Sequence, residues 1–205
     1  MSAILYAMAD TASKLDARVR RSRLRLRQAL VELVLQRGYD AVTIRDLTSR
    51  ADVGYATFFR HFQDKDALLR SLLDELLDEL MSLLAPSLAD ADASRTGTLV
   101  FEHVQQNADL YRVLISSQRF VDLVSRAASL GETEMRRDHA LSGDALLPPD
   151  AAVNHLVKST IALIEWWLYA GMSPDPRRMG EAFEVLIMAP VKAVAFRRLS
   201  GARPS

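Results

Sequence analysis

The stretch GYATFFRHF, residues 54–62, places four aromatic rings within nine residues. In a helix, the rings of Tyr55, Phe58, Phe59 and Phe62 spread around much of the circumference, so they cannot all face one core. Phe58 and Phe62 are four residues apart and share one face, which we expect to be buried. The opposite face offers the side chains that could contact a partner: Tyr55, Ala56, Thr57, Phe59 and His61.

Two further helices are predicted before this stretch. Apolar residues at helical spacing indicate a helix over about residues 20–37. Thr43 fits the N-cap of a short second helix, with Asp46 at its third position in a capping box shortened by the use of Asp for Glu. A tight turn at residues 52–54 then leads into the aromatic stretch. A longer helix followed by two short helices around a tight turn is the layout of a helix-turn-helix DNA reader. A small helical unit whose aromatic residues are all buried is the alternative.

The charge of the chain is distributed unevenly. The net charge of the 205 residues is zero, but residues 1–65 hold twelve Lys and Arg against seven Asp and Glu, and the remainder carries the compensating −5. A basic N-terminal part on an acidic body favours contact with a polyanion such as nucleic acid. Chance clustering is the other interpretation.

Several classes of function find no support in the sequence. There is no cysteine, which excludes disulfides and thiolate chemistry. We find no glycine-rich phosphate loop, no nucleophile elbow and no paired spacing among the four histidines, so we predict no enzyme, no cofactor and no metal site. The opening MSAILYAMAD does not resemble a signal peptide, and no apolar run is long enough for a bilayer. We therefore expect a cytoplasmic protein with no membrane contact.

The whole chain is predicted to be all-α, with about nine helices in two parts. We expect a flexible extension over residues 1–19, a helix-turn-helix domain over 20–66, and a helical body over 67–205. Beyond the N-terminal domain, helices are expected at these positions: 63–84 with an end near Pro86, 95–107, 109–117, 119–141, 150–171, and 177–199 with a kink at Pro190.

The segment RQALVELVLQRGYDAVTIRDLTSRADVGYATFFRHFQDKDALL, residues 27–69, closely resembles the DNA-binding region of tetracycline-repressor (TetR) family transcription regulators. The resemblance runs over about residues 22–70 and includes the turn and the aromatic-Arg-His-Phe-x-x-Lys pattern. It implies that Thr43, His61 and Lys65 hold phosphates. It also implies that the second helix of the pair reads the major groove, with Arg45 as a further base or backbone contact. The DNA-binding residues expected on this basis are Thr43, Arg45, Tyr55, Ala56, Thr57, Phe59, His61 and Lys65.

Two residues depart from the family pattern. Gly54 stands where a serine or threonine often caps the reading helix, so that hydroxyl is missing. Phe59 stands where a tyrosine often donates to a phosphate, so its ring can only pack against sugar or protein. The basic residues Arg18, Arg20, Arg21 and Arg23 could reach a minor groove or form a solvated tail.

Past residue 70 the resemblance is architectural. It implies a body that binds a small-molecule effector and pairs two subunits through helices near 150–171 and 177–199. The ligand-binding candidates are Met81, Phe101, His103, Tyr111, Phe120, Trp166 and Tyr169, each of which could equally be an ordinary core residue.

The function implied is that of a homodimeric repressor, which binds a palindromic DNA operator and is released by a small, largely apolar molecule. Three alternatives remain open from the sequence. The regulator could respond to a protein partner, it could act as an activator, or the chain could be a small-molecule carrier with weak DNA binding.

Overall fold

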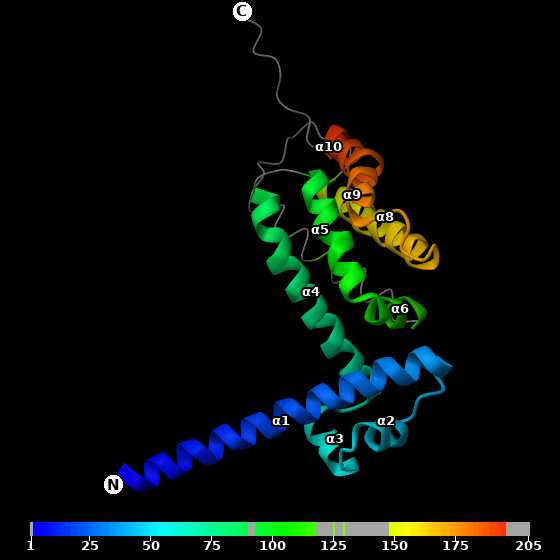
Figure 1. The fold of residues 1–205 in the computed structure, drawn as a ribbon. Coiled ribbons are helices and arrows are strands. Elements are labelled where there is room, and N and C mark those ends of the chain that lie inside the picture. The colour runs from blue at the N-terminus through cyan, green and yellow to red at the C-terminus, as the bar shows by residue number, and fades with distance from the viewer. Residues whose placement is uncertain (1, 90–92, 118–124, 126–128, 130–147, 196–205) are drawn as a thin grey trace, which may run out of the picture. The chain divides into compact units, whose positions relative to one another are not determined.

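The computed structural model describes residues 2–89, 93–117, 125, 129 and 148–195. These residues form helices and connecting turns, and no strand occurs among them, so the predicted all-α class is confirmed. The chain divides into two compact units, Met1–Glu75 and Leu76–Ser205 (Figure 1). The division falls inside a helix, nine residues later than the boundary expected at 66.

The first unit contains three helices and the start of a fourth. These are α1 (Ser2–Arg37), α2 (Ile44–Ala51), α3 (Tyr55–His61) and the opening turns of α4 (Lys65–Ala89). Its core is apolar and draws on all four helices: Leu26, Ala29, Leu30, Val34, Leu47, Ala51, Phe58, Phe62, Leu68, Leu69, Leu72 and Leu73 are buried.

The first helix is much longer than expected. It begins at Ser2 and extends well past α3 (Figure 1), whereas the sequence predicts a flexible extension over residues 1–19. The segment from Ser2 to Arg37 contains neither glycine nor proline and is rich in Ala, Leu and Arg, which favour helix.

The second unit contains the rest of α4 and the helices of the body. These are α5 (Ala93–Gln106), α6 (Ala108–Ser116), α8 (Pro149–Tyr169), α9 (Pro176–Phe183), the π-helical turn η1 (Glu184–Met188) and α10 (Ala189–Ala195). Helix α4 continues through Pro86 and ends three residues beyond it. The helix predicted over 119–141 lies outside the described residues. No described helix is long and apolar enough to cross a membrane.

Helices α5 and α9 pack at very short range because glycines meet at their crossing. A Cβ atom built on Gly97 would lie 3.0 Å from the Cα of Gly180, and one on Gly180 would lie 2.6 Å from the backbone nitrogen of Thr98. Only glycine leaves room for backbones this close. Beside the crossing, Phe101 of α5 and Trp167 of α8 are fully buried and meet edge to face at 5.2 Å.

A π turn lies directly before Pro190, the position at which the sequence predicts a kink. Residues Glu184–Met188 are wound more widely than an α-helix, and the amide of Ala189 donates to the carbonyl oxygen of Glu184, five residues back. Pro190 has no amide hydrogen and cannot continue the α-helical ladder. A π turn directly before it is one of the recognised ways in which a helix adjusts at such a point.

Candidate nucleic-acid interface

The aromatic residues of α3 are divided between core and surface. Phe58 is fully buried and Phe62 nearly so, as their spacing predicted. Tyr55 and Phe59, by contrast, keep 52% and 47% of their surface exposed, with their ring centroids 5.2 Å apart. Two rings therefore fix the short helix to its neighbours, and two rings are left on the outer face.

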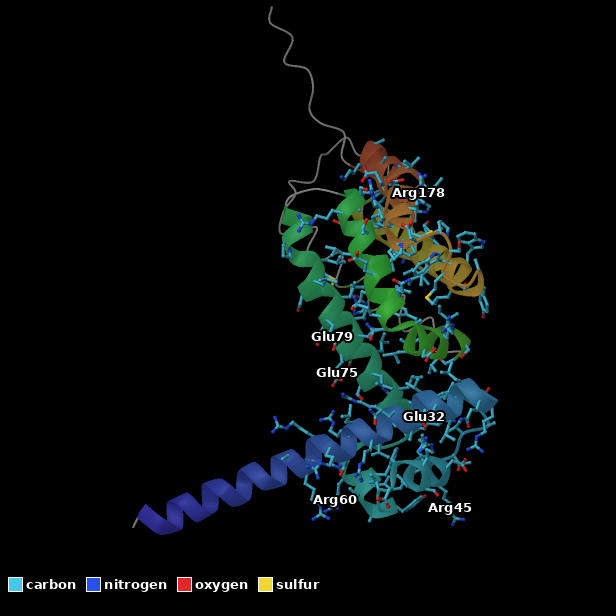
Figure 2. The ribbon with its side chains drawn as sticks, in the orientation of Figure 1. Glu32, Arg45, Arg60, Glu75, Glu79 and Arg178 are labelled. Atoms are coloured by element: carbon cyan, nitrogen blue, oxygen red, sulfur yellow. The ribbon has the colours of Figure 1, made fainter. Side chains whose placement is uncertain are left out.

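The outer face of α3 continues onto α2. Ala56 is exposed beside Tyr55, and Arg45 of α2 is exposed across a shallow hollow from that tyrosine. The hollow is lined by Arg45, Thr48, Ser49, Val53 and Tyr55. Figure 2 shows Arg45 and Arg60 projecting from α2 and α3. The structure thus brings together on one surface several residues that the sequence assigned to DNA.

Thr43 forms a reciprocal cap at the start of α2, as predicted. Its hydroxyl accepts from the amide of Asp46 at 3.2 Å and donates to the Asp46 carboxylate at 2.6 Å, and its own amide donates to the same carboxylate at 2.9 Å. These bonds, together with the guanidinium of Arg37 at 2.8 Å, lower the pKa of Asp46 to about 2. The Thr43 hydroxyl is therefore already used within the cap. At this end of α2, the backbone amides of the first turn are the groups that could bind a phosphate.

Lys65 fastens the loop between α1 and α2. Its Nζ donates to the carbonyl oxygens of Tyr39 at 2.7 Å and Val42 at 2.8 Å, and it lies 4.1 Å from the centre of the Tyr39 ring. The Tyr39 hydroxyl in turn donates to the carboxylate of Asp66. A role for Lys65 in holding phosphate stays a prediction, and the structure adds a role in the fold.

Thr57, one of the expected DNA-binding residues, is half-buried and already has a partner. The Nη2 of Arg60 donates to its hydroxyl oxygen at 2.7 Å. Arg60 was not among the residues assigned to DNA from the sequence, although its position three residues after Thr57 places it on the same face of the helix.

His61 is half-buried at the end of α3. Burial, then the positive charges of Arg23 and Arg60, hold the pKa of its imidazole below the ordinary 6.5. The Arg23 guanidinium comes from α1 and stands over the ring of Phe62, 5.4 Å from its centre. No pattern in the sequence signals this contact, because it joins residues 39 positions apart in the chain.

In the second unit, a buried polar pair contains two of the ligand-binding candidates. His103 Nδ1 and the Tyr111 hydroxyl are 3.1 Å apart, and both side chains are almost fully buried. The other ring nitrogen of His103, Nε2, is buried without a hydrogen-bond partner among the described residues, with the Glu79 carboxylate 3.9 Å away. Burial lowers the pKa of His103 and raises that of Tyr111, so both groups are neutral at pH 7.

The other ligand-binding candidates differ in their burial. Phe101 is fully buried, Met81 is half-buried on α4, and Phe120 lies outside the described residues. Trp166 and Tyr169 differ from the expectation of a pocket lining, because they are 54% and 78% exposed at the C-terminal end of α8. Within the described parts of the chain, no group of three or more His, Asp or Glu is placed to hold a metal ion.

The three helices around the exposed face of α3 define the class: a helix-turn-helix domain of the DNA-reading type. Residues 26–72 match the family model described as bacterial regulatory proteins, tetR family. The N-terminal domain of the chain thus matches the DNA-binding domain of the TetR family, and the resemblance seen in its sequence is confirmed over these residues. Regulators of this family are not enzymes, in agreement with the sequence prediction.

Known relatives match part of the chain. The chain is 43% identical over 47 residues to the HTH-type transcriptional repressor Rv3405c of Mycobacterium tuberculosis, which is 23% of this chain and 25% of that protein. It is 28% identical over 91 residues to the uncharacterised HTH-type transcriptional regulator YvkB of Bacillus subtilis, which is 43% of this chain and 48% of that protein. The chain thus spans about half the length of YvkB and a quarter of that of Rv3405c.

The fold is also shared with solved structures. A Syntrophomonas wolfei protein assigned to the TetR family superposes with a TM-score of 0.70 at 17% identity, over 87% of this chain and 99% of that one. At this level of identity the similarity establishes the fold.

Proposed function

We propose that the protein is a transcription regulator that binds a palindromic DNA operator as a homodimer, and that it acts as a repressor. The observation that carries this proposal is the outer face of α3, where Tyr55 and Phe59 stay exposed while Phe58 and Phe62 hold the helix in place. A short helix with a fixed inner face and an open outer face is suited to entering a major groove. The exposed guanidinium of Arg45 on the adjoining helix supplies positive charge beside it.

The test is a gel-shift titration of the purified protein against the DNA upstream of its own gene, with and without excess non-specific competitor. We expect a discrete complex that survives competitor. Tyr55→Ala should weaken this specific complex more than it weakens binding to competitor DNA, whereas Tyr55→Phe separates the contribution of the ring from that of the hydroxyl. Equal losses of affinity for both DNAs would show that Tyr55 does not contact bases.

The homodimer is proposed to form through the outer face of α8 and η1. Trp166, Tyr169, Val185 and Leu186 are all more than half exposed there, which is unusual for large apolar side chains. Several residues of the apolar stripes on these helices, such as Val153, Ile164 and Ile187, are instead buried within the protomer and are not available for pairing. A dimer is also required physically, because one reading helix contacts only one half-site and two must be about 34–36 Å apart.

The effector is proposed to bind in the second unit beside His103. A buried nitrogen without a hydrogen bond is costly, so a ligand that bonds to Nε2 gains free energy that the empty protein lacks. We expect a small, largely apolar molecule with one polar group. Screening compounds for release of the gel-shift complex tests this, and His103→Phe should abolish the response while leaving operator binding intact.

Coupling between effector and operator is proposed to run through α4. This helix begins at Lys65 in the first unit and continues through the division at Glu75 to Ala89 in the second. A ligand that favours one position of α4 over another would change the spacing of the two reading helices. If the gel shift shows no sequence-selective binding, the carrier function becomes the better account. If DNA binding is sequence-selective but no small molecule releases the protein from DNA, control by a protein partner becomes the better account.

A further inference from the structure

The residue of α3 that points most directly away from the core is Arg60. Phe58 and Phe62 are buried in the core of the first unit, and Arg60 lies midway between them in the sequence. Because two residues span little more than half a turn of helix, the Arg60 side chain leaves α3 on the side opposite to both rings. It is exposed, and Figure 2 shows it projecting from the helix. Arg60 therefore lies at the centre of the outer face of α3.

The Arg60 guanidinium is held in position by Thr57. Its Nη2 donates to the Thr57 hydroxyl oxygen at 2.7 Å, which turns the arginine side chain back toward the first turn of α3. No carboxylate among the described residues pairs with Arg60. Other arginines of the first unit are paired with acids: Arg25 with Asp52, Arg27 with Glu75, Arg37 with Asp46 and Arg50 with Glu32. The Arg60 side chain is thus oriented by a neutral neighbour, and its charge is not neutralised there.

The bond between the two side chains determines which hydrogens they can offer to a partner. A guanidinium has only donors, so Thr57 is the acceptor, and its hydroxyl keeps its own hydrogen for a further bond. No acceptor for that hydrogen lies in the described part of the chain. Arg60 keeps the second hydrogen of Nη2 and those of Nη1 and Nε. The pair therefore presents two adjacent donors, whose heavy atoms are 2.7 Å apart.

We propose that Thr57 and Arg60 act together as a base-reading pair and that they recognise a guanine in the major groove. Guanine presents two acceptors, N7 and O6, on its major-groove edge. Adenine has an amino donor in place of the second acceptor, cytosine offers an amino donor, and thymine has one acceptor beside a methyl group. Two adjacent donors therefore fit guanine best. The proposal rests on the proposed DNA-binding function and adds to it Arg60 and the identity of one base.

The surroundings of the pair favour a base edge over a phosphate. Ala56 is exposed on the same side of α3 and carries only a methyl group, so a base can approach the helix closely. When a helix enters the major groove, the side opposite to its core faces the bases, and the phosphates lie along the borders of the groove. Arg60 occupies that central side. A phosphate can also accept from two donors, and the experiment is designed to separate the two partners.

The first test is selection of preferred duplexes from a random DNA library by the full-length wild type, Arg60→Met and Thr57→Val. Arg60→Met removes all the donors of the guanidinium, and Thr57→Val removes the hydroxyl with little change of volume. We expect the wild type to select a G·C pair at one fixed position of each half-site. Both variants should lose the preference at that position and keep it elsewhere. Arg50→Met, at an exposed arginine paired with Glu32, is the matched control and should select the wild-type sequence.

The second test replaces the selected guanine and measures the dissociation constant of the wild type. 7-Deazaguanine lacks N7, whereas inosine keeps N7 and O6 and lacks only the amino group that lies in the minor groove. We expect 7-deazaguanine, or an A·T pair in place of the G·C pair, to weaken binding by roughly tenfold. Inosine should bind as guanine does. For Arg60→Met the same replacements should change the affinity by less than about threefold, because the paired donors are gone.

One set of results overturns this proposal and leaves the proposed function standing. It includes a guanine preference that persists in Arg60→Met and Thr57→Val, and a preference lost at an A·T pair instead. It also includes equal weakening on all duplexes, with the slope of log affinity against log salt concentration (the salt slope) flatter by about 0.9 per site, which would assign Arg60 to a phosphate. If the wild type selects no sequence at all, this proposal and the proposed function are both wrong.

Discussion

At the scale of single residues, Gly54 is an N-cap position that lacks a stabilising side-chain hydrogen bond. It caps α3 with φ −61° and ψ 139°, which any residue can adopt, and no side chain bonds the first turn. A Cβ atom there would lie 3.5 Å from the Thr57 hydroxyl oxygen, an ordinary contact. Gly54→Ser should therefore raise the free energy of unfolding by about 0.5–1 kcal/mol through capping and reduced freedom of the unfolded chain. Urea denaturation measures this. Gly38→Ser is the opposite control, because Gly38 has φ +81° and the substitution should destabilise the protein.

Lys65 allows a fold role and a DNA role to be separated. Lys65→Met removes a charged donor from the carbonyl groups of Tyr39 and Val42, and we expect a loss of about 1–3 kcal/mol in unfolding free energy. If Lys65 also holds a phosphate, the variant flattens the salt slope by about 0.9 per site. Reduced stability with an unchanged slope would assign Lys65 to the fold alone. Unchanged stability would contradict its role in fastening the loop.

Residues whose roles are set by their near neighbours could be predicted from the sequence. The cap of Thr43 and Asp46, the burial of Phe58 and Phe62 and the missing cap at Gly54 follow from spacings of three or four positions. Contacts between distant segments could not be predicted. The contacts of Arg23 with Phe62 and of Lys65 with Tyr39 depend on how α1 and the start of α4 pack. From the sequence, Lys65 was assigned to DNA by resemblance, and Arg23 was left between a minor-groove contact and a solvated tail.

At the scale of the helices, the crossing of α5 and α9 depends on two glycines. A Cβ atom on Gly180 would lie 2.6 Å from the Thr98 nitrogen and 2.7 Å from the Ser94 carbonyl oxygen, both of them backbone atoms. Gly180→Ala should therefore destabilise the protein by about 1–3 kcal/mol. Helix propensity alone predicts the reverse, a gain of about 1 kcal/mol. Thermal or urea unfolding gives the sign, and a stabilised variant would show that the helices can separate without cost.

The free energy of unfolding depends on pH through His103 of α5, whose ring contacts the Tyr111 hydroxyl of α6. Burial lowers its pKa in the folded state, against the opposing effect of Glu79, while Tyr111 occupies the other ring nitrogen. The folded protein thus binds fewer protons than the unfolded chain, and the free energy of unfolding falls as the pH drops below about 6.5 toward the folded pKa. His103→Gln should lose this acid-dependent part, whereas His155→Gln, at an exposed position of α8, should keep it. Parallel pH profiles for wild type and His103→Gln would contradict the prediction.

A comparison of predicted and observed helix ends shows which features of the helices could be predicted from the sequence. The expected start of α8 is one residue late and that of α5 two residues late, because prolines and polar breaks mark these ends. The start of α1 is wrong by about eighteen residues, since no break separates Ser2 from Arg37. Pro190 indicated where the last helix departs from regular α-helical geometry, but the sequence could not say that a π turn would form before it.

At the scale of the whole molecule, function depends on the pairing of two chains, and the exposed apolar face of α8 and η1 makes this testable. Leu186→Glu places a charge in a face that we propose to be buried in the dimer, and burial of an unpaired carboxylate strongly opposes association. We expect a monomer in analytical ultracentrifugation at micromolar concentration, and at least roughly a hundredfold loss of affinity for a two-half-site operator, because each head then binds alone. Leu83→Glu, at a 40% exposed leucine of α4, is the matched control and should remain dimeric.

If Leu186→Glu sediments with the mass of the wild type, the subunits pair elsewhere. If the variant is monomeric but keeps full operator affinity, pairing is not what aligns the two reading helices, and the spacing mechanism proposed for effector release loses its basis.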